Sequence, residues 1–241
     1  MTIALAALAG LLLGGVLNVI IQRLPTPQPF FRGLHCVRCG HALSWEAVPL
    51  VGFLVQRGRC RHCGQPIPKV FPLVELLTAL SFAILVWRYG LTWLAGLYAF
   101  FSLALIITLF LDWLRHEIYY IILLPGTIVA LLSSLFPVRG LGFTNSLLGL
   151  IAGLFFFGLL FVFGHLLFHI EALALGDVWL AGMIGAMMGF YGALLTLAGG
   201  IVLAAVGAGL LLALRKVSTK DYMPYGSYLC LAALLYLCFW A

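Results

Sequence analysis

Acidic residues are rare in this chain, and two of the seven stand where they can act together. Asp112 ends an apolar run in Leu-Phe-Leu-Asp, and Asp177 opens another in Ala-Leu-Gly-Asp-Val-Trp. When two carboxylates share a partly buried site, one keeps its proton while the other ionises. Such a pair can activate water, polarise a carbonyl group and protonate a leaving amine. Asp112 and Asp177 are therefore candidates for the catalytic pair of an aspartyl protease.

Each aspartate also has an ordinary structural interpretation. Asp112 can pair with Arg115 at the end of the same helix. Asp177 can cap the helix that it opens, because Asp is favoured at helix N-termini. Other hydrolytic chemistry has less support, since the chain contains no G-x-S-x-G, no H-E-x-x-H and no phosphate-binding loop.

Four cysteines form a second set of candidates in two CxxCG motifs, which begin at Cys36 and Cys60. Two such turns supply four thiolates to a tetrahedral zinc ion, and the Gly after each pair permits the tight turn. A pair of disulfides is the alternative, and a reducing cytoplasm would disfavour it. A four-thiolate site has no open coordination position, so the predicted zinc site is structural. Its ligands would be Cys36, Cys39, Cys60 and Cys63.

Composition indicates the solvent in which these groups work. The chain is 64% hydrophobic and 8% charged, whereas soluble domains carry about 25% charged residues. Its apolar runs have the length that the hydrocarbon core of a bilayer requires. We expect an all-α bundle of about eight transmembrane helices. The expected spans are 2–22, 72–89, 92–112, 118–137, 144–168, 173–192, 194–214 and 223–240, with a break near Gly192 dividing the sixth from the seventh.

The ends of these spans suggest domains and an orientation. No basic residue precedes Arg23, unlike in a secretory signal, so 1–22 is predicted to be a retained first helix. Residues 23–71 form the expected zinc module, and 72–241 the multi-helix membrane domain. All Lys and Arg except Arg88 and Arg139 fall in loops on one face, which the positive-inside rule places in the cytoplasm. The net charge of +6 is thus explained by orientation in the lipid bilayer, and no nucleic-acid partner is expected.

Short motifs follow one another along nearly the whole chain. They are Gly14-Gly15-Val-Leu-Asn18 with Arg23-Leu-Pro25, the two cysteine motifs, Leu43-Ser-Trp45, Pro49, Phe71-Pro72-Leu-Val-Glu75, Asp112 with Ile118 and Pro125, Glu171 through Asp177 with Gly185 and Gly189, and Met223-Pro224-Tyr225-Gly226. In this order and at these spacings they resemble the type IV prepilin peptidase family, which consists of membrane aspartyl proteases of the GxGD type.

The resemblance implies a multi-pass enzyme of the bacterial inner membrane. It would cleave the short basic leader from prepilins or pseudopilins on the cytoplasmic side, after a glycine, with Asp112 and Asp177 as the catalytic pair. Relatives with the cysteine module often also methylate the new N-terminus with S-adenosylmethionine. That second activity stays open here, and no residue of this chain is assigned to it.

Three positions depart from the family pattern. Ala174 replaces a glycine and Trp179 a lysine near the second aspartate, and Tyr119 replaces a proline after the first. Two alternatives therefore remain. One is a catalytically degenerate homologue that binds pilin-like proteins. The other is a small transporter, which is disfavoured because transport sites lie near the midplane of the membrane, whereas both aspartates lie at predicted helix ends.

Overall fold

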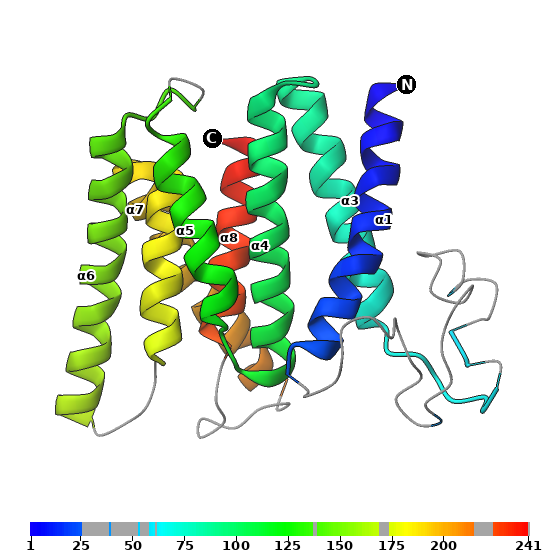
Figure 1. The fold of residues 1–241 in the computed structure, drawn as a ribbon. Helices are drawn as coiled ribbons and strands as arrows, with labels where there is room; N and C mark the ends of the chain where they lie inside the picture. Colours follow the sequence, from blue (N-terminus) through cyan, green and yellow to red (C-terminus); the bar gives the residue numbers. More distant parts are fainter. Residues whose placement is uncertain are drawn as a thin grey trace. The chain divides into compact units, whose positions relative to one another are not determined.

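The computed structural model of the protein describes residues 1–25, 39, 53, 58–60, 62–136, 139–168, 174–214 and 224–240. Helices are the regular elements of these residues, which confirms the expected all-α class (Figure 1). The helices are α1 (Thr2–Arg23), α3 (Val70–Tyr89), α4 (Trp93–Arg115), α5 (Tyr120–Ser133), α6 (Phe143–Phe168), α7 (Leu175–Ala213) and α8 (Tyr225–Phe239).

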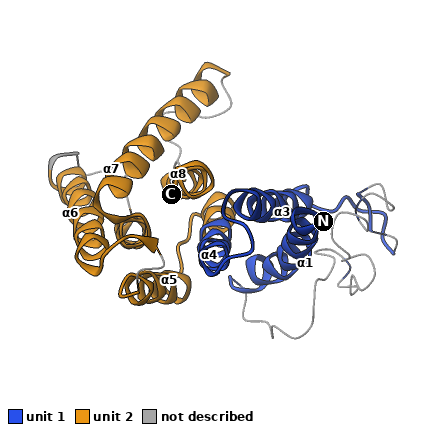
Figure 2. Ribbon diagram, turned by 90° about the horizontal axis from the view of Figure 1, so that it is seen from above, with its two compact units in different colours: residues 1–107 blue, residues 108–241 orange. Residues whose placement is uncertain are grey.

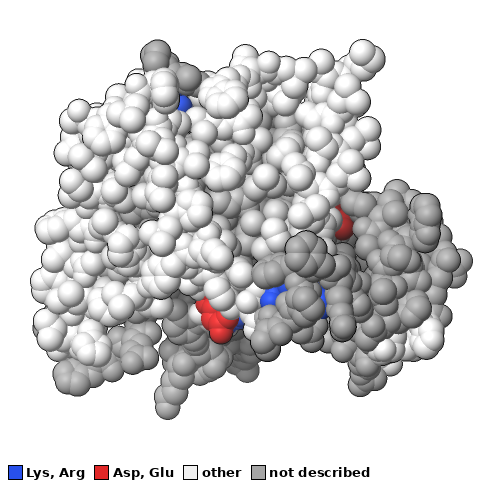
Figure 3. All heavy atoms as spheres, viewed as in Figure 1, with Lys and Arg blue, Asp and Glu red and all other residues white. Residues whose placement is uncertain are grey.

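The outer surface of the helices is apolar. In the described part of the chain, α1, α3, α4, α6 and α7 are long and apolar enough to cross a membrane, while α5 and α8 are shorter apolar helices. Few charged side chains of the described residues appear on the face drawn in Figure 3. Leucines such as Leu8 and Leu12 on α1 are more than half exposed, which is stable only where lipid covers them. The expected membrane protein is confirmed.

The sixth and seventh predicted spans are joined in one long helix that bends. The bend in α7 lies at Gly189, where φ is 72° and ψ is −179°, less than one helical turn before Gly192, near which the sequence suggested a break. Only glycine adopts this backbone conformation without steric cost, which explains why the break falls at this residue. After Gly189, α7 runs antiparallel to α8, since Gly192 lies against Tyr236 and Gly207 against Tyr228.

The chain divides into two compact units, residues 1–107 and 108–241 (Figure 2). In the first unit, α1 packs on α3 through Gly10 and Gly14. A Cβ atom at Gly10 would lie 2.7 Å from the Cα of Ala79, and one at Gly14 would lie 2.7 Å from the Cα of Glu75. Small residues at this spacing let membrane helices approach closely enough for dispersion and hydrogen bonds to hold them. Asn18 supplies such a bond, donating through Nδ2 to Oε1 of Glu75 at 3.0 Å.

In the second unit, α6 and the first part of α7 are in backbone contact. A Cβ atom at Gly149 would lie 2.2 Å from the carbonyl oxygen of Gly185, and one at Gly153 would lie 2.2 Å from that of Ala181. No side chain fits at either glycine without moving the helices apart. This contact fixes the distance between α6 and the part of α7 that follows Asp177.

Polar side chains complete the hydrogen bonds that the bend in α7 leaves open. Arg139, which is buried, donates to the carbonyl oxygens of Ala186 and Met187 in α7. It also donates to the carbonyl oxygen of Ala130 in α5 at 2.8 Å. Asn145 accepts a hydrogen bond from the main-chain N–H of Phe190 at 2.9 Å. A broken helix within a membrane is stable only when other groups satisfy its backbone in this way.

Candidate active site and cysteine cluster

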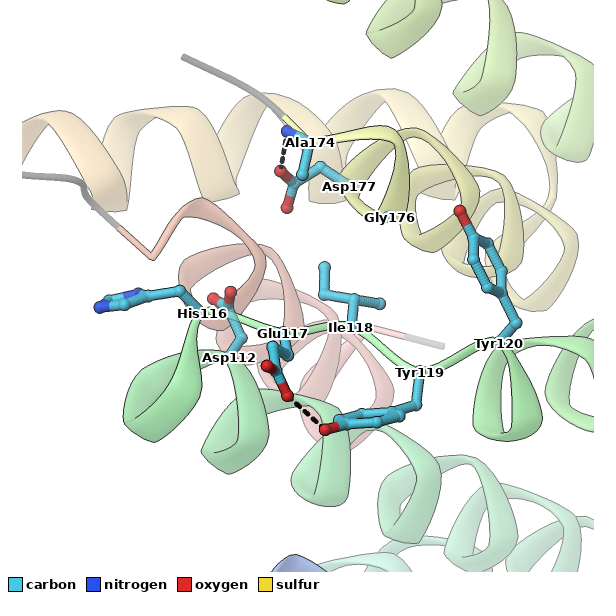
Figure 4. Close-up of a pocket in the computed structure, with 9 residues that line it drawn as sticks. All are labelled: Asp112, His116, Glu117, Ile118, Tyr119, Tyr120, Ala174, Gly176 and Asp177. Carbon is cyan, nitrogen blue, oxygen red and sulfur yellow. Dashed lines mark hydrogen bonds between the residues drawn. The ribbon is translucent and has the colours of Figure 1, made fainter. Parts of the chain in front are cut away.

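Asp112 and Asp177 lie on one cavity of about 410 Å³ within the second unit. Figure 4 shows that the cavity is bounded by the end of α4, the segment leading to α5 and the start of α7. The residues that line it are Asp112, His116, Glu117, Ile118, Tyr119, Tyr120, Ala174, Gly176 and Asp177. The two carboxylates, 65 positions apart in the sequence by their residue numbers, are thus brought to a single site.

Asp112 is held by the start of α8. Its side chain is 2% exposed, and Oδ2 accepts hydrogen bonds from the main-chain N–H of Ser227 at 2.6 Å and from the Ser227 hydroxyl at 2.7 Å. Gly226 makes this approach possible, because a Cβ atom there would lie 3.1 Å from Cγ of Asp112. The carboxylate therefore receives donors from the positively polarised end of another helix, which favours negative charge.

Asp177 is held by its own helix. Oδ2 accepts a hydrogen bond from the main-chain N–H of Ala174 at 2.9 Å, and the side chain is 1% exposed. The structural interpretation as a helix cap is therefore correct, and it is compatible with the chemical one because the residue also faces the cavity (Figure 4). Gly176 lets α7 approach the opposite wall, since a Cβ atom there would lie 2.9 Å from Cβ of Ile118.

Glu117 and Tyr119 form a polar pair on the cavity wall. The Tyr119 hydroxyl donates a hydrogen bond to Oε2 of Glu117 (Figure 4). Burial raises the pKa of Tyr119 to about 12. The hydrogen bond to Glu117 and the negative charge of Glu117 also raise it. Tyr119 consequently remains a protonated donor at neutral pH. The tyrosine that replaces the family's proline thus adds a hydroxyl to this wall.

Two other departures from the family pattern also lie at this site. Trp179 makes an edge-to-face contact with Tyr120, with ring centroids 6.2 Å apart. Both side chains are partly exposed, at 42% and 44%. An aromatic pair therefore occupies the place where a lysine would bring positive charge. Ala174 lines the cavity and keeps its main-chain N–H on Asp177, so the missing glycine does not remove that bond.

The arrangement suits acid–base chemistry on a bound peptide. Two nearly buried carboxyl groups on one cavity can divide the roles of acid and base, one protonated and the other ionised, as hydrolysis by an aspartyl pair requires. Sequence reasoning placed both aspartates at helix ends, and the structure agrees. It missed Ser227, whose only sequence signal is that it directly follows Pro224-Tyr225-Gly226.

Three of the four predicted zinc ligands lie together in the first unit. The sulfur atoms of Cys39, Cys60 and Cys63 are all within 4.8 Å of one another, and those of Cys39 and Cys60 are 4.0 Å apart. Cys36 lies outside the described residues. Gly64 has a φ of 69°, so the expected tight turn is present after the second pair. The Cys60 side chain is buried against Val19 and Phe71.

Thiolates around one zinc ion lie about 2.3 Å from the metal, which separates neighbouring sulfurs by about 3.8 Å in a tetrahedron. The observed separation of 4.0 Å between Cys39 and Cys60 is close to that value. The cluster can therefore bind a metal ion, and its donor set suits zinc.

Comparison with known proteins accounts for both halves of the chain. Residues 8–89 match the Bacterial Peptidase A24 N-terminal domain, and residues 99–210 match the Type IV leader peptidase family. A Pseudomonas aeruginosa protein named prepilin leader peptidase/N-methyltransferase is 32% identical over 93% of this chain and 86% of its own length. A protein of the same name from Pseudomonas putida is 30% identical over 95% of this chain and 88% of its own.

A third protein of that name, from Myxococcus xanthus, is 38% identical over 74% of this chain, and the match spans 54% of its own length. No solved structure shows a significant match. The fold and the site define an all-helical membrane protein with two carboxylates on one cavity. The chain belongs to the type IV leader peptidase family, which confirms the resemblance seen in its motifs.

Proposed function

We propose that this protein is a membrane aspartyl endopeptidase that removes the basic leader of prepilins or pseudopilins. The observation that carries the proposal is that Asp112 and Asp177, from different helices, line one cavity. The names of the related proteins support the substrate class. By the family resemblance, cleavage follows a glycine.

In the proposed reaction, the ionised aspartate takes a proton from a water molecule, whose oxygen attacks the scissile carbonyl carbon. The protonated aspartate donates a hydrogen bond to the carbonyl oxygen as it becomes negative. The tetrahedral intermediate collapses, the C–N bond breaks, and a carboxyl group delivers a proton to the leaving amine. Asp112 and Asp177 suffice for every proton transfer in this sequence.

The position of the pair suits a substrate anchored in the membrane. Both aspartates lie within one turn of a helix end: α4 ends at Arg115 and α7 begins at Leu175. A substrate whose apolar helix packs in the bilayer would present the residues beyond that helix at this level. The scissile segment must be extended there, because a helical backbone hides its carbonyl groups.

Leader cleavage by membranes that contain the full-length protein and a co-expressed prepilin tests this proposal. Asp112→Asn and Asp177→Asn should each lower kcat by about 10²- to 10⁴-fold. Both variants should keep most of their thermal stability, because the side-chain oxygen of Asn can still accept the hydrogen bonds from Ala174 and Ser227. If both cleave as fast as the wild-type protein at matched levels, the aspartates are not the catalytic pair. An inactive wild-type protein would instead support the degenerate homologue, and Ala174, Trp179 and Tyr119 would be reverted first.

We propose that Cys36, Cys39, Cys60 and Cys63 hold a structural zinc ion. The support is the close group of three sulfurs and the positive φ of Gly64, with the fourth ligand taken from the sequence motif. Zinc would supply a cross-link between the two CxxC turns, and with four thiolates it would leave no position for a reactant. Metal analysis of the purified protein tests this, and zinc-free protein would contradict it.

We further propose that the new N-terminal amine is methylated. The support is the second half of the relatives' name and the presence of the cysteine motifs, which accompany this activity in the family. S-adenosylmethionine would supply the methyl group. Incubation of membranes and cleaved pilin with S-adenosylmethionine that carries a labelled methyl group tests this. The proposal fails if the cleaved substrate acquires no label.

The proposed orientation places the cysteine cluster and the active site at the cytoplasmic face of the inner membrane. Its support is the concentration of basic residues in the loops on that side. After a chelator has removed any zinc, a membrane-impermeant thiol reagent should then reach Cys39, which is exposed, in inverted vesicles only. Labelling of Cys39 in right-side-out vesicles would show that the protein has the opposite orientation.

A further inference from the structure

We propose that Ser227 is a positioning residue that holds the Asp112 carboxylate in its reactive orientation. The described hydrogen bonds of the Asp112 side chain all go to Oδ2, and all come from Ser227. The other carboxylate oxygen, Oδ1, is thereby left for water or substrate in the cavity. This inference rests on the proposed function, because it assigns Ser227 a part in the same reaction.

The contact is buried and short. Ser227 is 3% exposed and Asp112 is 2% exposed. The main-chain N–H and the hydroxyl group of Ser227 lie 2.6 Å and 2.7 Å from the same oxygen. Two hydrogen bonds to one carboxylate oxygen restrict rotation of the whole group. Bonds of this kind to a charged acceptor are roughly twice as strong as neutral ones.

The place of Ser227 in α8 explains why the main-chain donor is available. Ser227 is the third residue of the helix, and N–H groups in the first turn have no partner within a helix. The N-cap residue is Pro224, which makes no side-chain cap hydrogen bond. The carboxylate of Asp112, from α4, satisfies the orphan donor instead. Helix α8 and the active site therefore depend on the same hydrogen bond.

The hydroxyl group adds something that the main-chain N–H does not. A serine hydroxyl has one hydrogen and two lone pairs. Its oxygen lies 2.7 Å from Oδ2 of Asp112 and 3.0 Å from the carbonyl oxygen of Leu109. When Asp112 is ionised, the hydroxyl donates to it. When Asp112 is protonated on Oδ1, Oδ2 becomes a neutral and weaker acceptor, and the hydroxyl can turn its hydrogen to the carbonyl oxygen of Leu109 instead.

This adaptability matches the proposed reaction, because a carboxyl group that relays protons is ionised at one stage and protonated at another. The main-chain N–H is fixed in the helix and donates to Oδ2 in both forms, so it cannot change partner as the hydroxyl can. Alanine at position 227 would keep the main-chain N–H and lose the hydroxyl group. We therefore expect the chemical step to slow while the cavity that binds the peptide stays intact.

The test measures kcat and KM of the full-length protein in detergent with a purified prepilin. Ser227→Ala should lower kcat by about ten- to a hundredfold with little change in KM, the result of losing one hydrogen bond to a charged group. Ser227→Thr, which keeps a hydroxyl group at the same position, should keep most of kcat. If Ser227→Ala does not accumulate as folded protein, Ser227→Cys replaces it, because a thiol is a weak donor of similar size.

Ser81→Ala is the matched control. Ser81 is also 3% exposed, and its hydroxyl donates to the carbonyl oxygen of Leu77 at 2.8 Å. Its loss removes a buried hydroxyl group without touching either aspartate, so kcat should not change. Thermal unfolding of each variant is measured alongside, to separate a loss of folded protein from a loss of rate.

Three outcomes overturn the role of Ser227 while the wild-type protein remains active. They are an unchanged kcat in Ser227→Ala, a loss that lies entirely in KM, and a folded Ser227→Thr as slow as Ser227→Ala. An inactive wild-type protein instead overturns the proposed function, and this inference with it. The two failures are therefore distinguishable in one experiment.

Discussion

At the scale of single residues, the two aspartates each complete a helix N-terminus as well as facing the cavity. Asp177 accepts from the N-cap residue of its own helix, and Asp112 accepts from the first turn of α8. A structural role and the proposed chemical role are thus combined in one side chain. The donors place each carboxylate before any substrate arrives, which lowers the cost of reorganisation during the reaction.

Gly226 is the residue whose replacement tests this placement most directly. A Cβ atom at Gly226 would lie 3.0 Å from Ile118 and 3.1 Å from Cγ of Asp112. Gly226→Ala should therefore push α8 away from the carboxylate and lower kcat by about ten- to a hundredfold, because small misplacements of catalytic groups are costly. Leader cleavage with purified substrate gives the value.

Gly158→Ala is the control for this prediction. A Cβ atom at Gly158 meets only Cγ1 of Val178, at the ordinary distance of 3.9 Å. The control should keep its activity. Equal rates for Gly226→Ala and the wild-type protein would mean that α8 need not approach Asp112 so closely.

At the scale of elements, the helices that carry the site are held by backbone contact and by polar caps. Lipid is as apolar as the side chains that face it, so hydrophobic burial does little to associate helices within a membrane. The glycines between α6 and α7 let the two helix backbones approach closely enough for dispersion forces to hold them together. Arg139 then ties α5 to α7 at the bend, far along α7 from Asp177.

Replacing Arg139 should weaken this arrangement. Arg139→Met removes a buried donor from the carbonyl groups of Ala130, Ala186 and Met187, of which the first two keep the hydroxyl groups of Ser133 and Ser146. We expect the free energy of unfolding to fall by about 1–3 kcal/mol. Thermal unfolding in detergent measures the change. Arg88→Met removes an exposed cation predicted to lie on the same side of the membrane, 5.3 Å from the centroid of the Tyr89 ring, and should lower it by no more than about 1 kcal/mol. If both substitutions lowered the free energy of unfolding equally, Arg139 would not stabilise the bend in α7.

At the scale of the whole molecule, each unit has its own kind of stabilisation. The second unit depends on helix contacts around the cavity. The first combines the close α1–α3 contact with the cysteine cluster, whose Cys60 packs on Val19 and Phe71. Asn18 on α1 also donates to the carbonyl oxygen of Phe71, at 3.0 Å. A metal ion in the cluster would therefore stabilise the same end of the α1–α3 pair.

Loss of zinc should destabilise the first unit, which contains the cysteine cluster. Cys60→Ser should lower the zinc content from one ion per chain to near zero, and it should lower the melting temperature because binding energy at such sites is folding energy. Cys238→Ala, which changes a buried cysteine outside the cluster, should retain zinc. Metal analysis and thermal unfolding give both values. Full zinc content in Cys60→Ser would exclude this cysteine as a ligand.

The sequence by itself determined the class of the protein, the limits of most helices and the candidate chemical groups. Apolar runs, CxxCG turns and carboxylates at helix ends are local patterns, and local hydrogen bonding and solvation decide what they form. Only the tertiary structure decided where α7 bends, since Gly189 and Gly192 are alike in the sequence. It also decided that Ser227 meets Asp112 and that Arg139 meets Met187. Those contacts join segments far apart in the chain, and they depend on helix packing, which no local pattern encodes.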